Sequence, residues 1–220
     1  MTRRIMLWQT STFFAWFLGM TIGLTLGEVL SRNLNMLAYG NAGFPVGSLA
    51  RNVFTGATIG LLCGILQVRL ILENRLSPRR WILGNVMALG GAFLLAEILG
   101  FPVVSDIEYG ILFSFGFDLP PLWSPFAREV GLGNNTLGGP ISAIVVGVSA
   151  GVILFLFFRN ERNHLLHWVF GYGLGPALGL IVGIIPIIFS DELLVVAAVT
   201  GLVVGITQGL SVPRYLTQNH

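Results

Sequence analysis

The sequence contains 220 residues, of which 54% are hydrophobic and 10% are charged. Ordinary soluble domains carry roughly 25% charged residues, so this composition excludes a soluble enzyme and a disordered tail. The net charge of +2 comes from arginines scattered in short stretches between apolar runs, a distribution that predicts no nucleic-acid partner. The one cysteine, Cys63, excludes a disulfide framework.

Six apolar segments are each long enough to form a helix across a bilayer, which takes about 20 residues. They run over residues 9–30, 53–72, 80–99, 140–158, 166–189 and 193–211. Ser77 followed by Pro78, Pro140 after two glycines, and Asp191 before the last segment are typical of helix starts. The sequence therefore predicts an all-α integral membrane protein of six transmembrane helices, folded as a single domain over 1–220 in a lipid bilayer.

The arginines predict the orientation of these helices, because cytoplasmic segments are enriched in positive charge. With the amino terminus inside, the inner segments hold nine arginines and two acidic residues, whereas the outer segments hold three arginines and eight acidic residues. The charge is then +7 inside and −5 outside, in agreement with the net +2. We expect both termini in the cytoplasm, in a plasma membrane or a thylakoid-type inner membrane.

Two short patterns recur along the chain. W-x2-G begins at three tryptophans in the odd-numbered segments: Trp16, Trp81 and Trp168. G-x3-G-x2-Q occurs in the second and sixth segments, and the fourth lacks only its glutamine: Gly60, Gly64, Gln67; Gly201, Gly205, Gln208; Gly147, Gly151, Leu154. The patterns predict three copies of one helical hairpin, at 9–72, 80–158 and 166–211, with an outer insertion at 100–139.

Glycines extend these patterns in steps of four, as in Gly19, Gly23 and Gly27. Four residues advance about 400° on a helix, so such glycines form a smooth stripe. Small residues let membrane helices approach closely, and we interpret the stripes as glycine-zipper packing rather than as the lining of a pore.

The hairpin formed by Gly60, Gly64 and Gln67, an arginine-rich turn, and Trp81 with Gly84 resembles uncharacterised multi-pass membrane proteins of photosynthetic bacteria. The resemblance covers most of the helical part and neither of the outer stretches at 31–52 and 100–139, and the fourth segment departs from it by lacking the glutamine. It implies the architecture, and it implies no activity, because those proteins have none established.

Polar residues at membrane depth are costly unless paired, so they are candidates for function. Gln67 and Gln208 lie toward the cytoplasmic ends of their helices. One interpretation is an amide bonded to a tryptophan indole or to a neighbouring carbonyl. The other is a polar vestibule or a ligand for a pigment-like cofactor.

Acidic residues mark the outer end of each odd-numbered helix, at Glu28, Glu97 and Asp191. Such a ring would attract cations to an outer mouth, although carboxylates at helix ends are also where solvent begins. Glu97 is flanked by apolar residues on both sides, and a buried Glu97 would suit a proton role.

Helix 5 contains Pro176 and Pro186, which predict a kink or a broken helix. Near its start, His164 and His167 lie three apart, but no carboxylate or thiol cluster completes a metal site, so we predict an anchoring role at the interface and no metal. No cofactor is predicted, because no motif supports a bound lipid or pigment.

The segment 100–139 is rich in aromatic residues and interrupted by prolines. It would lie on the membrane, cap the bundle or dock onto a partner. Enzyme signatures such as HExxH and G-x-S-x-G do not appear in a supporting strand–turn–helix context. Two functions follow: a non-catalytic accessory or assembly subunit of a larger membrane complex, docking through 100–139, or a small transporter or channel with an acidic outer mouth.

Overall fold

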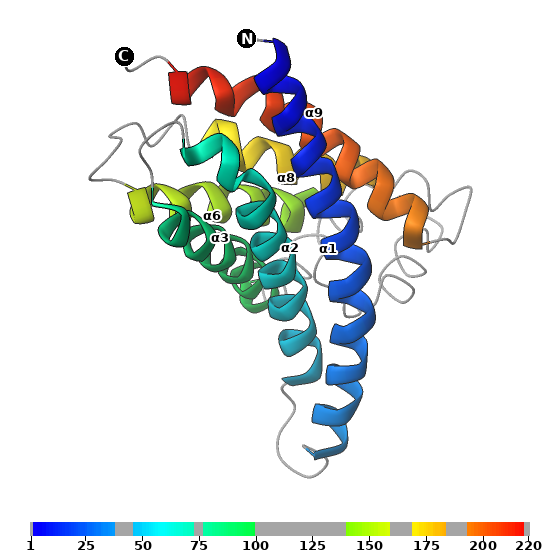
Figure 1. Cartoon of the computed structure of the whole chain (residues 1–220). Coiled ribbons are helices and arrows are strands. Elements are labelled where there is room, and N and C mark those ends of the chain that lie inside the picture. The colour runs from blue at the N-terminus through cyan, green and yellow to red at the C-terminus, as the bar shows by residue number, and fades with distance from the viewer. Residues whose placement is uncertain are drawn as a thin grey trace, which may run out of the picture.

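The computed structural model describes residues 2–37, 46–72, 77–99, 140–158, 169–183 and 193–217 (Figure 1). These residues form helices throughout, apart from Ser77. In chain order they are α1 (Thr2–Leu37), α2 (Val46–Leu72), α3 (Pro78–Leu99), α6 (Pro140–Phe158), the π-helical turn η2 (Val169–Gly173), α8 (Leu174–Gly183) and α9 (Leu193–Thr217). Each of the six apolar segments contains a helix, which confirms the all-α fold.

Three of these helices contain a stretch that is long and apolar enough to cross a membrane. The stretches are Arg3–Ser31 in α1, Leu49–Val68 in α2 and Leu194–Ser211 in α9. Shorter apolar helical stretches cover Ala143–Phe158 and Val169–Gly183. These lengths support a membrane protein.

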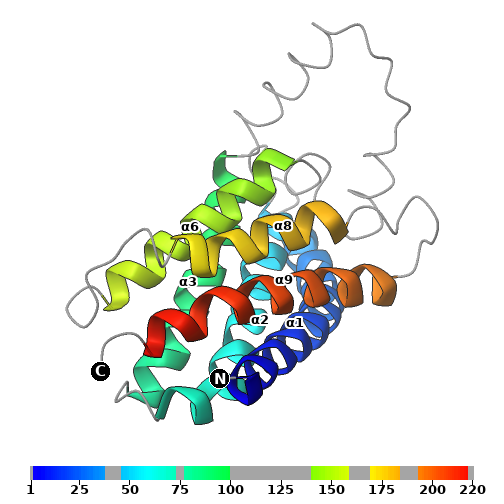
Figure 2. The same ribbon diagram turned by 90° about the horizontal axis from the view of Figure 1, so that it is seen from above.

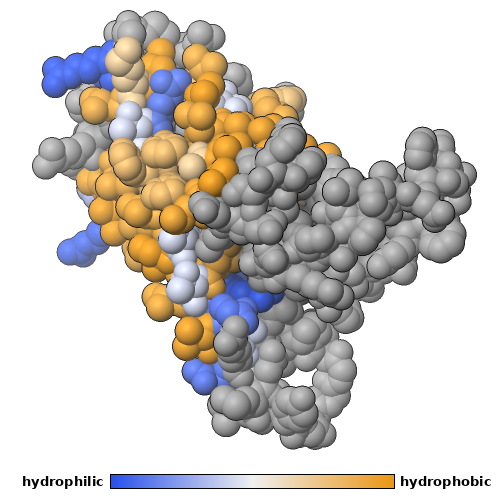
Figure 3. Space-filling view, turned by 90° about the vertical axis from the view of Figure 1, so that its right-hand side faces the viewer, coloured by the Kyte–Doolittle hydropathy of each residue, from blue (hydrophilic) through white to orange (hydrophobic). Residues whose placement is uncertain are grey.

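The outer surface of the bundle is apolar on every helix, as the orange atoms in Figure 3 show for one face. Large exposed side chains recur four residues apart, so that each helix presents a stripe to its surroundings. The stripes include Phe14, Leu18, Ile22 and Leu26; Leu61 and Ile65; Leu83 and Met87; Ile144 and Val148; Leu174 and Leu178; and Leu202, Ile206 and Leu210. A surface of this kind is stable against lipid and unfavourable in water.

Several hydroxyl groups on these helices are hydrogen-bonded to the backbone of their own helix. Thr21 and Thr58 each donate to the carbonyl four residues earlier, at 2.8 Å, and Thr207 does the same at 2.7 Å. Because the helix itself supplies the acceptor, such a residue is tolerated in an apolar environment.

The helices pack as a closed sequence of neighbours, in which each contacts the next and α9 returns to α1. Figure 2 shows α8 lying between α6 and α9. In Figure 1, α1 begins and α9 ends at the same end of the molecule, and the α1–α2 pair extends beyond the other helices at the opposite end.

Glycines lie where neighbouring helices meet, and an added Cβ at these positions would contact the adjacent helix. A Cβ at Gly23 would come within 2.8 Å of Thr55 Cα, and one at Gly64 within 2.7 Å of Ile82 Cα. The same holds at the α8·α9 and α9·α1 contacts, for Gly175, Gly179, Gly201 and Gly205. These backbones approach closely only because the side chain is missing.

Two sequence predictions about helix limits hold and one is wrong. α3 begins at Pro78 with the Trp81 N–H donating to the Ser77 carbonyl at 2.9 Å, and α6 begins at Pro140. The expected outer stretch 31–52 is wrong in extent, because residues 31–37 and 46–52 are helical. Its polar residues Arg51 and Asn52 are buried rather than solvated, and the absent side chain of Gly27 leaves room for Arg51.

The interior has two layers. The apolar layer is centred on α1 beyond Trp16 and consists mainly of Trp16, Met20, Leu24, Ile59, Leu89, Phe93, Val146, Leu180, Val196 and Val204. The aromatic layer lies nearer the starts of α1 and α3 and consists of Trp8, Trp81, Ala88, Leu154, Phe158 and Tyr172. Exposed arginines occur at the starts of the same two helices, at Arg3, Arg4, Arg79 and Arg80, so we call this the arginine-bearing end.

Candidate functional site

Five buried polar side chains from five different elements gather beside the aromatic layer. We call them the polar cluster: Thr12 of α1, Gln67 of α2, Asn85 of α3, Tyr172 of η2 and Gln208 of α9. None of them is more than 2% exposed. A polar group at this depth is stable only when it is hydrogen-bonded, so the geometry of the cluster decides what it does.

Gln67 is the central member, because both ends of its amide are bonded. Its Nε2 donates to Thr12 Oγ1 at 2.9 Å, and its Oε1 accepts from the Tyr172 hydroxyl, also at 2.9 Å. Since η2 packs mainly against α6, α8 and α9, the Tyr172 side chain crosses the bundle to reach α2. Gln67 therefore links three helical elements that are far apart in sequence.

Pro176 explains the irregular backbone on which Tyr172 sits. A proline has no N–H to donate to the carbonyl four residues earlier, and its ring crowds that carbonyl. In this helix the carbonyl belongs to Tyr172, within the π-helical turn Val169–Gly173. Gln208 Nε2 donates to it instead, at the long distance of 3.5 Å. The break predicted from Pro176 thus takes the form of a π-helical turn, and Pro186 lies outside the described residues.

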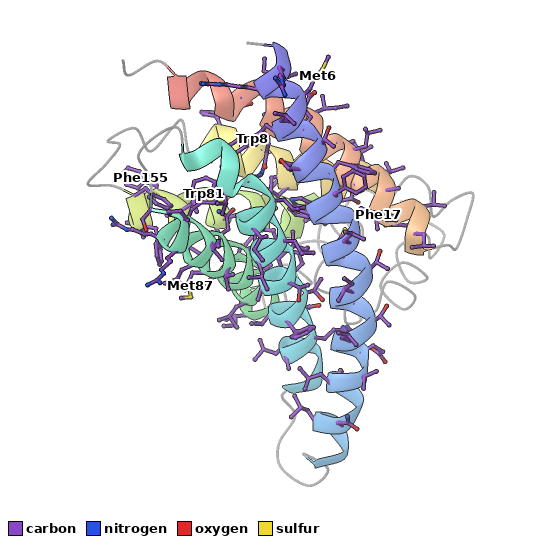
Figure 4. All side chains as sticks on the ribbon, viewed as in Figure 1. Met6, Trp8, Phe17, Trp81, Met87 and Phe155 are labelled. Carbon is purple, nitrogen blue, oxygen red and sulfur yellow. The ribbon has the colours of Figure 1, made fainter. Side chains whose placement is uncertain are left out.

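Asn85 and Trp81 connect the polar cluster to the aromatic layer. Asn85 Nδ2 donates to the Trp81 carbonyl at 2.9 Å, and its side chain lies beside the Tyr172 hydroxyl. The Trp81 ring makes edge contacts with Trp8 at 6.1 Å and with Tyr172 at 5.8 Å between centroids. Figure 4 shows Trp8 and Trp81, from α1 and α3, converging on this region. Such perpendicular arrangements are favoured for aromatic pairs.

Arg80 closes the aromatic layer on the side of α6. Its Nη2 donates to the Phe157 carbonyl at 2.8 Å, and its guanidinium lies 5.7 Å from the centre of the Phe158 ring. A cation at the carboxyl end of a helix satisfies the last carbonyls and complements the helix dipole.

The two glutamines selected from the sequence come together in this site. Gln208 bonds to a carbonyl, as one interpretation predicted, whereas Gln67 bonds to Thr12 and Tyr172 rather than to an indole. Trp16 and Trp81 are both fully buried, but Trp16 lies in the apolar layer instead.

Of the acidic candidates, Glu28 is described with its side chain, and it does not lie in this site. Glu28 Oε2 accepts from Arg51 Nη1 at 2.8 Å, and the Arg51 side chain is only 8% exposed. This ion pair offsets the negative charge that an acidic outer mouth would need. Glu97 belongs to α3, but its side chain is not among those described. Asp191, Trp168, His164, His167 and the segment 100–139 also lie outside the described residues.

Sequence reasoning missed three members of the polar cluster: Thr12, Asn85 and Tyr172. A signal exists for two of them, because Asn85 and Tyr172 occupy the same position when residues 59–88 are placed on 146–175. Thr12 carries no such signal. Together the five members offer neutral amide and hydroxyl groups, and none of them is a carboxylate, an imidazole or an amine. The cluster is suited to holding helices together and to binding hydrogen-bonding groups.

Comparison with known proteins yields no further identification. No family model, no curated protein and no solved structure matches the chain significantly. Among the described residues, no group of three or more His, Cys, Asp or Glu side chains is placed to hold a metal ion.

Proposed function

We propose that the chain is a non-catalytic integral membrane protein with six transmembrane helices and with both termini in the cytoplasm. The apolar stripes on all six helical segments support six spans, because each presents a lipid-compatible surface. The common location of the start of α1 and the end of α9 supports a shared side for the termini (Figure 1). The excess of arginine in the inner segments supports the cytoplasm as that side.

A glycine zipper and a threefold repeat of one hairpin form part of this proposal. Within the α2·α3 contact, a Cβ at Gly60 would lie 2.8 Å from Val86 Cα, and at the α6·η2 contact one at Gly147 would meet the Gly173 carbonyl. Placing residues 59–88 on 146–175 superposes Gly60 on Gly147 and Val86 on Gly173. The two contacts therefore use matching positions, as copies of one hairpin would.

Within the membrane, this bundle serves as an accessory or assembly subunit of a larger complex. The engagement of Gln67 carries this proposal: its side chain is 0% exposed and both ends of its amide are bonded to other helices. A polar group that lines a transport path faces water. The Gln67 amide instead bonds to neighbouring helices and holds them together. Function then belongs to the surface and to the aromatic segment 100–139, whose sequence suits docking on a partner.

Gentle detergent extraction from native membranes tests this role. Native electrophoresis with mass spectrometry should find the chain at fixed stoichiometry with a larger membrane complex. Deletion of residues 111–123 should release that complex while leaving the thermal unfolding of the bundle unchanged. Recovery of the intact chain only as a monomer or small homo-oligomer would contradict the accessory role.

Cysteine accessibility tests the orientation. In a Cys63→Ala background, Asn33→Cys at the far end of α1 and Ser77→Cys before α3 are both exposed positions at opposite ends of the bundle. A membrane-impermeant maleimide should label Asn33→Cys in intact cells and Ser77→Cys only after the cells are opened. The reverse labelling would invert the orientation, and equal labelling of both would refute it.

A small transporter or channel is the second candidate, favoured by the backbone of η2. Broken helices that release backbone carbonyls occur at the substrate sites of transporters, and Pro176 releases the Tyr172 carbonyl here. Its acidic outer mouth would use Glu28, Glu97 and Asp191. Ion or proton flux into proteoliposomes should then fall in Glu97→Gln, whereas the accessory role predicts no flux in either protein.

A further inference from the structure

Three polar atoms around the aromatic layer have no hydrogen-bond partner within the described part of the chain. They are Trp8 Nε1, Asn85 Oδ1 and Gln208 Oε1. The residues are 2%, 0% and 1% exposed, so bulk solvent does not reach them. A buried donor or acceptor without a partner is unfavourable, and each of these requires an explanation.

The three residues surround Tyr172 and its neighbours. Asn85 lies beside the Tyr172 hydroxyl, and Gln208 approaches the Tyr172 carbonyl at the other end of the residue. Trp8 packs on Trp81, whose own ring contacts Tyr172. The three atoms therefore belong to one polar region rather than to separate defects in packing.

Their chemistry selects the molecule that would pair with them. The indole nitrogen is a donor, whereas the two amide oxygens are acceptors. A metal or ammonium ion would satisfy the oxygens and leave the indole unpaired. A small neutral molecule with lone pairs and O–H groups complements all three. We propose that ordered water molecules bind where the polar cluster meets the aromatic layer and bond to Trp8 Nε1, Asn85 Oδ1 and Gln208 Oε1.

Because the interior is layered, water reaches this site from one end of the bundle only. Trp8 and Trp81 lie within about two turns of the starts of α1 and α3, close to the arginine-bearing end. Further along the same helices, the apolar layer contributes only Trp16 Nε1 and the Cys63 thiol as polar side-chain groups. Water held in polar surroundings needs two to four polar partners, so the apolar layer stays dry. The bound waters exchange only with the arginine-bearing side.

Radiolytic labelling of the purified full-length protein tests this site independently of any partner. Brief X-ray irradiation converts bound water to hydroxyl radicals, which modify adjacent side chains, and mass spectrometry measures the rate at each residue. Trp16 is the matched control, because it is also buried, at 0% exposed against 2% for Trp8, and its Nε1 also has no partner among the described residues, yet it lies in the apolar layer. We expect Trp8 to be modified several-fold faster than Trp16.

Removing the acceptors should abolish the difference. In Asn85→Leu with Gln208→Leu, the rate at Trp8 should fall to that of Trp16, and Asn85→Leu alone serves if the double variant does not fold. Equal rates at Trp8 and Trp16 in the unaltered protein would overturn the proposal. A melting temperature that depends on sodium, potassium or ammonium when each is replaced by choline would also overturn it, in favour of a cation. Because no partner is present in these measurements, their failure is distinct from failure of the accessory role.

Discussion

The Tyr172 hydroxyl donates to Gln67 Oε1 at 2.9 Å and joins two residues 105 positions apart in the chain. In Tyr172→Phe this donor is lost, while the Gln67 oxygen stays buried. Interhelical hydrogen bonds in membranes contribute about 0.6 to 2 kcal/mol, so we expect a loss of about 1 kcal/mol. For a chain of this length that corresponds to about 2–4 °C in melting temperature, measured by tryptophan fluorescence in detergent.

The control for Tyr172→Phe is a double-mutant cycle with Gln67→Leu. Once Gln67 is absent, Tyr172→Phe has no hydrogen bond to break and should cost less than it does alone. Strictly additive effects would show that the bond contributes nothing to stability.

The same substitution should have opposite effects at two buried threonines. Thr12 Oγ1 accepts from Gln67 Nε2, so Thr12→Val leaves a buried amide donor unpaired and should lower the free energy of unfolding by about 1–3 kcal/mol. Thr200 is 1% exposed, and its Oγ1 has no hydrogen-bond partner among the described residues. Thr200→Val therefore keeps the volume, removes an unsatisfied group and should leave stability unchanged or raise it. Thermal unfolding of both variants in one detergent decides, and a larger loss at Thr200 would contradict this account.

Gly60→Ala should destabilise the α2·α3 contact. Its Cβ would meet the Asn85 carbonyl and lie 2.8 Å from Val86 Cα, both backbone atoms that cannot rotate away. Overpacking of this kind costs about 1–3 kcal/mol. Gly90→Ala is the matched control, because its Cβ would lie 3.4 Å from Ala57 Cβ, an ordinary contact. Titration with denaturing detergent should separate the two variants, and equal stability would show that the close approach at Gly60 is absent.

Pro176→Ala should make Gln208 dispensable. Alanine restores a backbone N–H that can donate to the Tyr172 carbonyl. In the native protein Gln208 Nε2 donates to that carbonyl. We expect Gln208→Leu to lower the melting temperature in the native background and to have a smaller effect in Pro176→Ala. An equal loss in both backgrounds would show that Gln208 stabilises the bundle by some other contact.

Glu28→Gln should cost more than removing both charges. The Arg51 side chain is 8% exposed and Glu28 is 39% exposed, so the cation is the member with less access to water. A buried charge without its partner is strongly unfavourable, whereas replacing a pair by apolar groups is often neutral. Glu28→Gln combined with Arg51→Met should therefore unfold at a higher temperature than Glu28→Gln alone. The opposite order would show that solvent reaches Arg51 freely.

The sequence predicts the helices of this protein better than their contacts. Apolar runs of bilayer length identify all six helical segments, because hydropathy depends on composition alone. The limits of α1 and α2 are missed, because Arg51 and Asn52 look like loop residues until Gly27 and Glu28 are placed against them. Polarity marks Gln67 and Gln208 as unusual. Their partners depend on which helices meet, and a threonine such as Thr12 attracts no notice because its own helix can satisfy it.

The contact of α9 with α1 has a consequence for biosynthesis. Gly205 lies against the Gln9 carbonyl, so among the described helices the earliest to be translated packs against the latest. Before α9 is translated, α1 and α2 can contact each other and form the Thr12–Gln67 hydrogen bond. The donor to Gln67 Oε1, Tyr172, is translated 105 residues after Gln67. An α1–α2 hairpin that forms before Tyr172 is translated therefore lacks the hydroxyl that bonds to Gln67 Oε1 in the folded protein. Any insertase or chaperone that accompanies this chain would have to shield that acceptor until Tyr172 arrives.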